Sequence, residues 1–392
     1  MTLMSPQPST DQAMADIARA PLSVRVVADE AAWDALEPEW SELFARSPQA
    51  ATPLRFDWLR EWWRIYGPAY GDGLRVITFR RGPQLVGVLP LYRAASLPVI
   101  GARRVGFLST GEREYEELCP DYLNLLCLPD EESSCLDTCA SALAEMDWDY
   151  LNLTCVPKEA PLCRLAEQGL KGARPSLLES GVCQIANLEG GFEEYLRRLS
   201  GKTRQHFRQY LRAAERYGAV LEIATRDSVD EFFDALVELH QLRWTSVGKP
   251  GAFSAPRFTE FHRSMARKWV PDGRALLARL SLGGRPLAVL YGFVTRSTFD
   301  YYQSGVRQDE TNALCSPGTV AQLLLMARLV EMGVTRYDFL RGSMTYKESM
   351  ATESRTLANL LFERSSARTM VDQSTRLVRR VVKGGLRRAF GK

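Results

Sequence analysis

The stretch that decides the fold is "CSPGTVAQLLLMARLVEMGVTRYDFLRGSMTYK", residues 315–347. Its central part predicts an amphipathic helix, because apolar residues recur at i, i+3, i+4 and i+7 between Val320 and Val330. Gly333 then ends the helix, and a strand follows over 335–340. A helix that joins two strands in this way is typical of a right-handed crossover between parallel strands.

The predicted helix begins with four small residues, Ser316, Pro317, Gly318 and Thr319. Ordinary capping explains the first two, since Ser is a favoured N-cap and Pro a favoured first residue. Gly318 is explained less well, because a glycine inside a helix costs about 1 kcal/mol relative to alanine. Uncovered N–H groups at a helix start bind anions. The sequence therefore predicts a phosphate-binding site at 316–319, with plain capping as the alternative.

The order of elements around this stretch occurs twice in the chain. Strand, two helices, three-stranded meander, helix and strand follow one another over 22–156 and again over 219–340. This repeat predicts an α/β (α+β) protein of two related lobes, each a mixed sheet flanked by helices. A strand over 355–363 is expected to close the second sheet. The predicted segments are a disordered lead-in (1–21), an N-terminal lobe (22–188), a basic connecting helix (189–218), a C-terminal lobe (219–365) and a basic amphipathic tail (366–392).

Length and composition exclude several classes of protein. A chain of 392 residues is too long for one ordinary core. The net charge of +3 argues against a polyanion binder, and without a helix-turn-helix or zinc-finger pattern we expect no DNA binding. No apolar run approaches the ~18 residues of a membrane span, and the N-terminus does not resemble a signal peptide, so a cytoplasmic protein is expected. The eight cysteines form no Cys-x-x-Cys pair, so no metal site is expected.

Four short motifs carry a family resemblance: "RW…GKPGAF" (243–253), "SPGT" (316–319), "YDFLRG" (337–342) and "YK" (346–347). The strand–helix–strand order resembles the GNAT acyltransferase fold, and the doubled lobe resembles FemAB-type transferases. The motifs resemble the acetyltransferase-like family that includes CelD-type cellulose-biosynthesis proteins, over roughly residues 22 to 365.

This resemblance implies transfer of an acyl group, acetyl by default, from acyl-CoA to an amine or hydroxyl of a cell-envelope or exopolysaccharide precursor. It places the CoA diphosphate at Ser316–Thr319 and implies no metal. In GNAT proteins a Tyr after the last parallel strand often protonates the leaving thiolate, and Tyr346 is at that place. If the strand ending at 306 separates from its neighbour, backbone N–H groups near Gly305 and Val306 are expected to stabilise an oxyanion.

Further polar residues are candidates for the acceptor side. Asp338 is a candidate base in an apolar strand, with a structural salt bridge as the alternative. His240 is a second candidate base, with a buried structural histidine as the alternative. Arg243, one turn further along the same helix, and Lys347 are candidates for binding the acceptor, Lys347 through a phosphate or carboxylate.

Two basic segments complete the prediction. Arg204, Arg208 and two further arginines at intervals of four form one stripe on a helix over 201–218. The stripe is either a solvated face or a track for an anionic acceptor such as a nucleotide- or lipid-diphosphate sugar. The segment 375–392 alternates basic and apolar residues, which suits either an amphipathic helix on an anionic membrane surface or a solvated tail.

Two other functions fit the same sequence. One is a FemAB-like aminoacyltransferase that uses aminoacyl-tRNA, and steeply salt-dependent affinity for tRNA would favour it. The other is a non-catalytic envelope-assembly protein that kept the fold and lost the site. Substitution of Tyr346, Lys347 or Asp338 would then leave its role unchanged.

Overall fold

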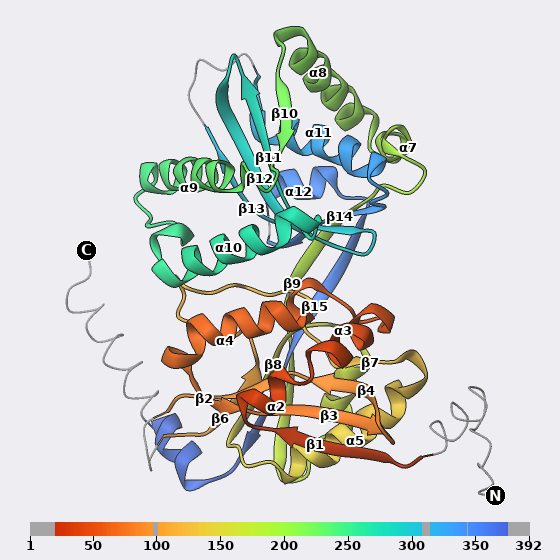
Figure 1. Ribbon diagram of the computed structural model, residues 1–392, viewed down its shortest axis with the longest axis vertical. Coiled ribbons are helices and arrows are strands. Elements are labelled where there is room, and N and C mark those ends of the chain that lie inside the picture. Colours follow the sequence, from red (N-terminus) through yellow and green to blue (C-terminus); the bar gives the residue numbers. More distant parts are fainter. Residues whose placement is uncertain (1–19, 97–100, 308–313, 343, 375–392) are drawn as a thin grey trace, which may run out of the picture.

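The computed structural model describes residues 20–96, 101–307, 314–342 and 344–374. Two lobes lie one above the other in Figure 1, joined by long strands. One sheet has the order β1-β3-β4-β7. The other has eleven strands in the order β10-β11-β12-β13-β14-β9-β15-β8-β6-β5-β2, and therefore runs through both lobes.

The elements follow the predicted order closely. The first lobe contains β1 (Leu22–Val27), α2 (Glu30–Asp34), α3 (Glu37–Arg46), α4 (Phe56–Tyr70), β2 (Gly71–Leu74), β3 (Val76–Arg81), β4 (Gln84–Leu89), β5 (Leu91–Ala94), β6 (Arg104–Phe107), β7 (Leu126–Cys127), α5 (Glu132–Glu145), β8 (Tyr150–Pro157) and α6 (Arg164–Gln168). After β9 (Ala173–Asn187) come α7 (Phe192–Arg198), α8 (Gly201–Tyr217), β10 (Val220–Ile223), α9 (Val229–Ser246), α10 (Pro256–Trp269), β11 (Ala275–Leu282), β12 (Arg285–Thr295), β13 (Thr298–Val306), α11 (Pro317–Glu331), β14 (Arg336–Arg341), α12 (Thr345–Met350) and β15 (Glu353–Arg364).

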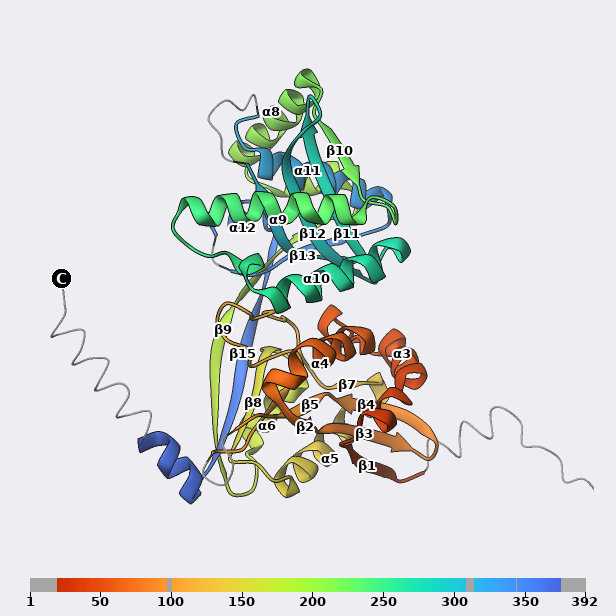
Figure 2. The same cartoon turned by 60° about the vertical axis from the view of Figure 1, so that its left-hand side comes forward.

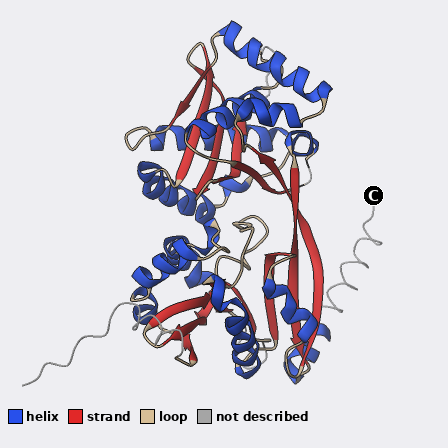
Figure 3. Ribbon diagram, turned by 90° about the vertical axis from the view of Figure 1, so that its right-hand side faces the viewer, coloured by secondary structure: helices blue, strands red, loops and turns tan. Residues whose placement is uncertain are grey.

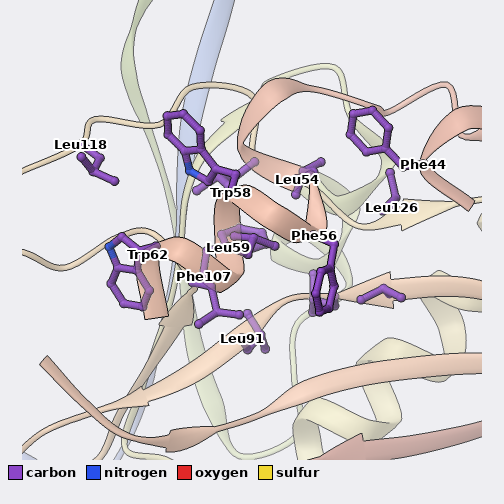
Figure 4. Packing of buried hydrophobic residues seen from close by; sticks show 14 of the residues in the cluster. Phe44, Leu54, Phe56, Trp58, Leu59, Trp62, Leu91, Phe107, Leu118 and Leu126 are labelled. Carbon is purple, nitrogen blue, oxygen red and sulfur yellow. The ribbon is translucent and has the colours of Figure 1, made fainter. Parts of the chain in front are cut away.

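One apolar cluster spans both lobes, and a second lies within the second lobe. Trp58 and Trp62 on α4 are fully buried, and Figure 4 shows them among the other apolar side chains of the first lobe. The Trp58 ring stacks on Trp269 of α10 in the second lobe, with ring centroids 5.8 Å apart. Large aromatic side chains bury 150–250 Å² each, so this contact contributes strongly to holding the lobes together.

The last strand of the chain is not where the sequence analysis placed it. β15 pairs with β8 of the first lobe over 357–363 and with β9 over its full length, so it does not simply close the second sheet. β9 in turn pairs with β14 over Cys183–Asn187. These two long strands form a ribbon that connects the lobes (Figure 3). β9 was not predicted, because much of its length is exposed and lacks apolar alternation.

The predicted basic connecting helix is two helices, α7 and α8. Both belong to the second lobe, where Phe207 and Ala214 of α8 join the apolar cluster that includes Val320 and Leu323 of α11. Figures 1 and 2 show α8 at the end of this lobe that lies farthest from the first lobe. The predicted lead-in over 1–21 falls almost wholly, and the basic stretch 375–392 wholly, outside the described residues. Among the described helices, none combines the length and the apolar character that a membrane span requires.

Candidate functional site at the separation of two strands

Strands β13 and β14 run parallel side by side and then part. Their residues pair over Thr298–Asp300 and Arg336–Asp338. Beyond Asp300, β13 continues to pair with β12 as far as Val306, while β14 bends at Leu340, whose φ is 55°. We call this divergence the strand split. It is the feature that the sequence analysis required for an oxyanion site.

Lys347 fixes the bend in β14. Its Nζ donates to the carbonyl oxygens of Phe339 at 2.7 Å and Arg341 at 3.2 Å, with Leu340 O at 3.4 Å. The side chain is buried, and burial lowers the pKa of Lys347. An ammonium has three donor hydrogens, and these three carbonyl oxygens account for all of them. The ammonium of Lys347 thus holds the backbone of the split, and its binding of the acceptor stays a prediction.

The N–H groups that face the split are those of Ser304 and Val306. The Arg307 N–H bonds to Leu287 O on β12 at 2.9 Å, and in an antiparallel ladder bonded and unbonded residues alternate. The Gly305 N–H accordingly points to β12, and its two neighbours point to the open side. The Ser304 N–H is held there by the Gln303 side chain, whose Oε1 accepts at 3.1 Å.

Gly305 has a packing role. A Cβ at this position would lie 2.6 Å from Leu239 Cβ and 2.7 Å from the backbone N of His240, both on α9. The missing side chain thus allows α9 to lie directly against β13. Ser304 therefore replaces Gly305 as the predicted backbone N–H donor. Val306, the other predicted donor, does face the split.

A pocket of about 610 Å³ lies on one face of the split, at the start of α11. We call it the α11 pocket. Its lining includes nine predicted or newly found site residues together with Tyr301 and Arg307. The nine are Arg243, Ser304, Val306, Ser316, Pro317, Gly318, Thr319, Gln322 and Tyr346. Four separate segments of the sequence thus converge where α11 presents its first N–H groups.

The α11 pocket is suited to an anionic ligand that also carries a hydrogen-bond donor. Arg243 forms no ion pair with any carboxylate in the described part of the chain, so its charge is available in the pocket. The uncovered N–H groups at the start of α11 add a partial positive charge. Gln322 is buried, and its Oε1 has no hydrogen-bond partner. An unsatisfied buried acceptor is costly unless a ligand completes it.

Tyr346 is half-buried in the same pocket. Its ring meets Phe339 edge-on, with centroids 6.4 Å apart, and burial raises its pKa. The neighbouring Tyr301 donates to Ser304 Oγ at 2.6 Å. A phenol with a raised pKa keeps its proton at neutral pH, which suits a proton donor.

A second pocket of about 760 Å³ lies on the opposite face of the sheet, beside α9. We call it the α9 pocket. Its lining comes from both lobes and comprises residues of the 114–121 loop, His240 and Trp244 of α9, the 248–252 loop, Phe258, Tyr302, Gln303 and the bend at 340–342. Tyr302 and Gln303 thus line this pocket, while Tyr301 and Ser304 line the α11 pocket. The two pockets meet at the strand split.

His240 is held in one tautomer. Gln241 Nε2 donates to Pro250 O at 2.7 Å, which makes Gln241 Oε1 the acceptor from His240 Nδ1 at 3.1 Å. The proton is therefore on Nδ1, and Nε2 has a free lone pair with no partner among the described residues. Burial lowers the pKa of His240 to about 4, so the ring is neutral at pH 7 and can accept a proton.

Asp338 does not join these residues. It accepts hydrogen bonds from the Tyr122 hydroxyl and from the Leu340 N–H, and it lines a separate cavity between the lobes. The side chains of Tyr337 and Phe339 pack into the second-lobe core, so alternation along β14 turns Asp338 to the other face. Its predicted role as a base stays a prediction, at a place away from Tyr346 and His240. The alternative, a structural salt bridge, does not involve the neighbouring Arg336, which pairs with Glu353.

The arginine stripe of α8 is remote from both pockets. Arg208 pairs with Glu193 at 3.0 Å, and Arg204 donates to Arg197 O at 3.1 Å. Neither residue lines the α11 pocket or the α9 pocket. Because α8 lies on the outer side of the second lobe, the stripe is not part of either pocket, and its role as a track for an anionic acceptor stays a prediction.

Sequence reasoning missed Ser304, Gln303 and Gln322. The signal for Gln322 was present, since it is a lone amide in the apolar part of the helix. Gln303 and Ser304 are polar residues near the end of the predicted strand "FDYYQSGV". Only the structure shows that Gln303 lines the α9 pocket and Ser304 the α11 pocket. The structure places no group of three or more His, Cys, Asp or Glu side chains in position to hold a metal ion, within the residues it describes.

Comparison with known proteins gives a family match and structural neighbours. Residues 201–348 match the acetyltransferase (GNAT) domain family, a segment that includes α8, the second-lobe residues of both pockets and the first turn of α12. The structure is similar to FemX, with a TM-score of 0.57 and 12% identity over 82% of this chain and 95% of that one. It is also similar to a conserved protein of unknown function from Bacteroides thetaiotaomicron VPI-5482, with a TM-score of 0.55 and 13% identity over 87% of this chain and 100% of that one. No curated protein matches.

These comparisons confirm the predicted fold class, mixed sheets flanked by helices: residues 201–348 match a GNAT domain, and the fold is similar to that of FemX. The match to a family of acetyltransferase domains supports a transferase activity in general terms. The finer assignment to the CelD type stays a prediction, as do the acyl donor and the acceptor.

Proposed function

We propose that this chain, whose residues 201–348 match a GNAT domain, transfers an acyl group from acyl-CoA to an amine or hydroxyl. Acetyl is the default acyl group. The observation that carries the proposal is that two pockets on opposite faces of one sheet meet at the strand split. A donor bound on one face and an acceptor bound on the other would bring their reacting atoms together without a covalent enzyme intermediate.

The α11 pocket is the proposed place of the donor. The first N–H groups of α11 and the Arg243 guanidinium would hold its phosphate oxygens. The unsatisfied Oε1 of Gln322 would accept from an amide N–H of the ligand. The bound acyl-CoA would supply the acyl group as an activated thioester.

Residues at the split would then act on the reacting atoms. The N–H groups of Ser304 and Val306 would stabilise negative charge on the acyl oxygen, once that oxygen replaces Gln303 Oε1 as the acceptor of the Ser304 N–H. His240 Nε2 would take the proton from the attacking amine or hydroxyl. Tyr346 would hold its hydroxyl proton for the leaving sulfur.

The α9 pocket is the proposed place of the acceptor, because His240 lies in its wall and both lobes contribute to it. A cell-envelope or exopolysaccharide precursor is the proposed acceptor class, from the resemblance of the sequence motifs. The aromatic residues Trp244, Phe258 and Tyr302 give this pocket flat apolar walls. Such walls suit a sugar ring or another flat body next to the reacting group.

The test is calorimetric titration of acetyl-CoA into the purified protein. We expect micromolar binding to the wild type, and at least tenfold weaker binding to Gly318→Glu and Arg243→Ala. Arg328→Ala is the matched control, since Arg328 is an exposed arginine near the other end of α11, where it pairs with Glu331. Equal affinity in all four proteins would contradict the assignment of the α11 pocket.

A thiol-release assay with amine and hydroxyl acceptors would follow, with His240→Ala expected to lose about 10²–10⁴-fold in rate. No binding of acetyl-CoA to folded wild type would refute the acetyl-CoA proposal. Binding of tRNA that weakens steeply with salt would then favour the aminoacyltransferase alternative.

A further inference from the structure

A third cavity, of about 720 Å³, lies between the lobes and is separate from both pockets of the strand split. We call it the interlobe cavity. The first lobe contributes residues 48–51, Tyr122, Asn124 and the 157–161 loop. The second lobe contributes the β12–β13 turn and the paired strands at Asp300 and Asp338. Its size is within the range of small-molecule sites, about 300–1,000 Å³.

The wall of the interlobe cavity contains two adjacent buried carboxyl groups. Asp300 and Asp338 are direct neighbours on the parallel strands β13 and β14, and 7% and 4% of their surfaces are exposed. Asp300 Oδ2 accepts from Thr52 Oγ1 at 2.6 Å, and Asp338 accepts from the Tyr122 hydroxyl. Burial raises the pKa of Asp300 to about 8 and that of Asp338 to about 6. Two such carboxyl groups side by side are stabilised by a shared proton or by a cation.

Two polar atoms in this wall have no partner in the described part of the chain. Asp300 Oδ1 is one, since its bond to Thr52 uses Oδ2. Asn124 Nδ2 is the other, because the Asn124 side chain, 4% exposed, is oriented by the Leu125 N–H, which donates to Oδ1 at 2.9 Å. An amide N–H can donate and a carboxyl oxygen can accept, so both atoms are able to bind a ligand in the cavity. The cavity therefore offers an unused acceptor on one lobe and an unused donor on the other.

The Arg355 charge favours the ionised form of Asp338 and the Arg55 charge that of Asp300, but within the described residues no arginine forms an ion pair with either carboxyl group. Arg336 pairs with Glu353 at 2.7 Å, Arg355 pairs with Glu159, and Arg296 donates to Ser47 O at 2.6 Å. A positive charge in direct contact with Asp300 and Asp338 would thus come from a ligand.

We propose that the interlobe cavity binds a small molecule that carries an ammonium group and, a few bonds away, a carbonyl or hydroxyl oxygen. The ammonium binds between Asp300 and Asp338, and the oxygen accepts from Asn124 Nδ2. α-Amino acid derivatives and amino sugars have this chemistry. Because its anchors lie on both lobes, the ligand also holds the lobes in their present arrangement.

The proposal is independent of the transfer reaction at the strand split. Asp121 lines the α9 pocket and the next residue, Tyr122, lines the interlobe cavity, so the chain itself separates the two spaces. A ligand in the interlobe cavity would have no contact with His240, and His240→Ala should retain its binding.

The experiment is calorimetric titration of L-alaninamide into the full-length protein at pH 7, with N-acetyl-L-alaninamide as the uncharged matched probe. We expect saturable binding of the first at millimolar concentrations or below and no binding of the second. Asp300→Asn and Asn124→Ala should each weaken binding at least tenfold, while Asp227→Asn, at an exposed aspartate, should not. Circular dichroism of each variant checks that it is folded, and Asn124→Ala tests the site even if Asp300→Asn does not fold.

Three results would overturn the proposal. They are no saturable binding of L-alaninamide to the wild type, equal binding of the acetylated probe, and unchanged affinity in both cavity variants. Loss of binding in His240→Ala would also overturn it, because the amine would then be bound in the α9 pocket.

Discussion

Replacement of Gly305 by alanine tests the link between packing and catalysis at the strand split. The new Cβ would lie 2.6 Å from Leu239 Cβ, about 0.8 Å closer than the 3.4 Å at which ordinary contacts begin. It would also lie 2.7 Å from His240 N and from Leu236 O, which are backbone atoms of α9. No change of rotamer relieves a clash with backbone, so α9 itself must move away from β13.

The expected cost of Gly305→Ala is about 1–3 kcal/mol of unfolding free energy, the usual range for adding carbon to a tightly packed site. Urea denaturation should show a lower midpoint with an unchanged m-value. Because His240 is on the helix that must move, the rate of acyl transfer should fall as well, by up to about 10²-fold for a displacement approaching 1 Å.

Gly201→Ala is the matched control for Gly305→Ala. Gly201 is at the start of α8, and a Cβ there would meet no atom within 4 Å. Its replacement should leave stability unchanged or raise it by up to ~1 kcal/mol. A Gly305→Ala protein as stable and as active as the wild type would refute the close approach of α9 to β13 and the dependence of His240 on it.

The other predictions concern buried charged groups. Lys347→Met should lower the free energy of unfolding by about 2–3 kcal/mol in urea denaturation, because it leaves the carbonyls of the bend without their charged donor. Asp300 has a folded pKa of about 8, above its unfolded value, so it stabilises the fold at low pH and this stability is lost as pH rises towards 8. Asp300→Asn should flatten the upper part of that pH dependence, measured as melting temperature against pH, while Glu112, with a pKa of about 7, keeps part of it. The acid limb of the transfer rate should lie near pH 4, where His240 titrates, and Gln241→Glu should move it up by roughly 1–2 units, because a carboxylate at Nδ1 favours the imidazolium.

Secondary structure was largely predictable because its causes are local. The helix at 317–331 is determined by its apolar spacing, its small N-terminal residues and Gly333, and all of these lie within one short stretch. The order of elements in each lobe follows from the same kind of pattern. The strand β9 escaped prediction because backbone pairing with β14 and β15 forms it, and its exposed side chains leave no apolar alternation.

The site was predictable only in part. Residues 316–319 and Tyr346 line one pocket, as the motifs suggested, and Arg243 joins them there. Lys347 and Asp338, which the sequence placed beside them, face backbone carbonyls and another cavity. Alternation along β14 decides this for Asp338, and the register of that strand against its neighbours cannot be read from six residues. Lys347 is on α12, and the bend of β14 brings the backbone carbonyls to its ammonium.

The sequence by itself determined which segments are helices and strands, that the order occurs twice, and that one helix starts with exposed N–H groups. Apolar periodicity, helix capping and the effect of glycine on the backbone each depend on a few consecutive residues, so the sequence shows them directly. Tertiary structure alone decided that Thr52 bonds to Asp300, 248 positions away, and that Tyr122 bonds to Asp338, 216 positions away. The burial of a carboxyl group, its partner and its proton depend on such distant contacts, which only the packing of the two lobes creates.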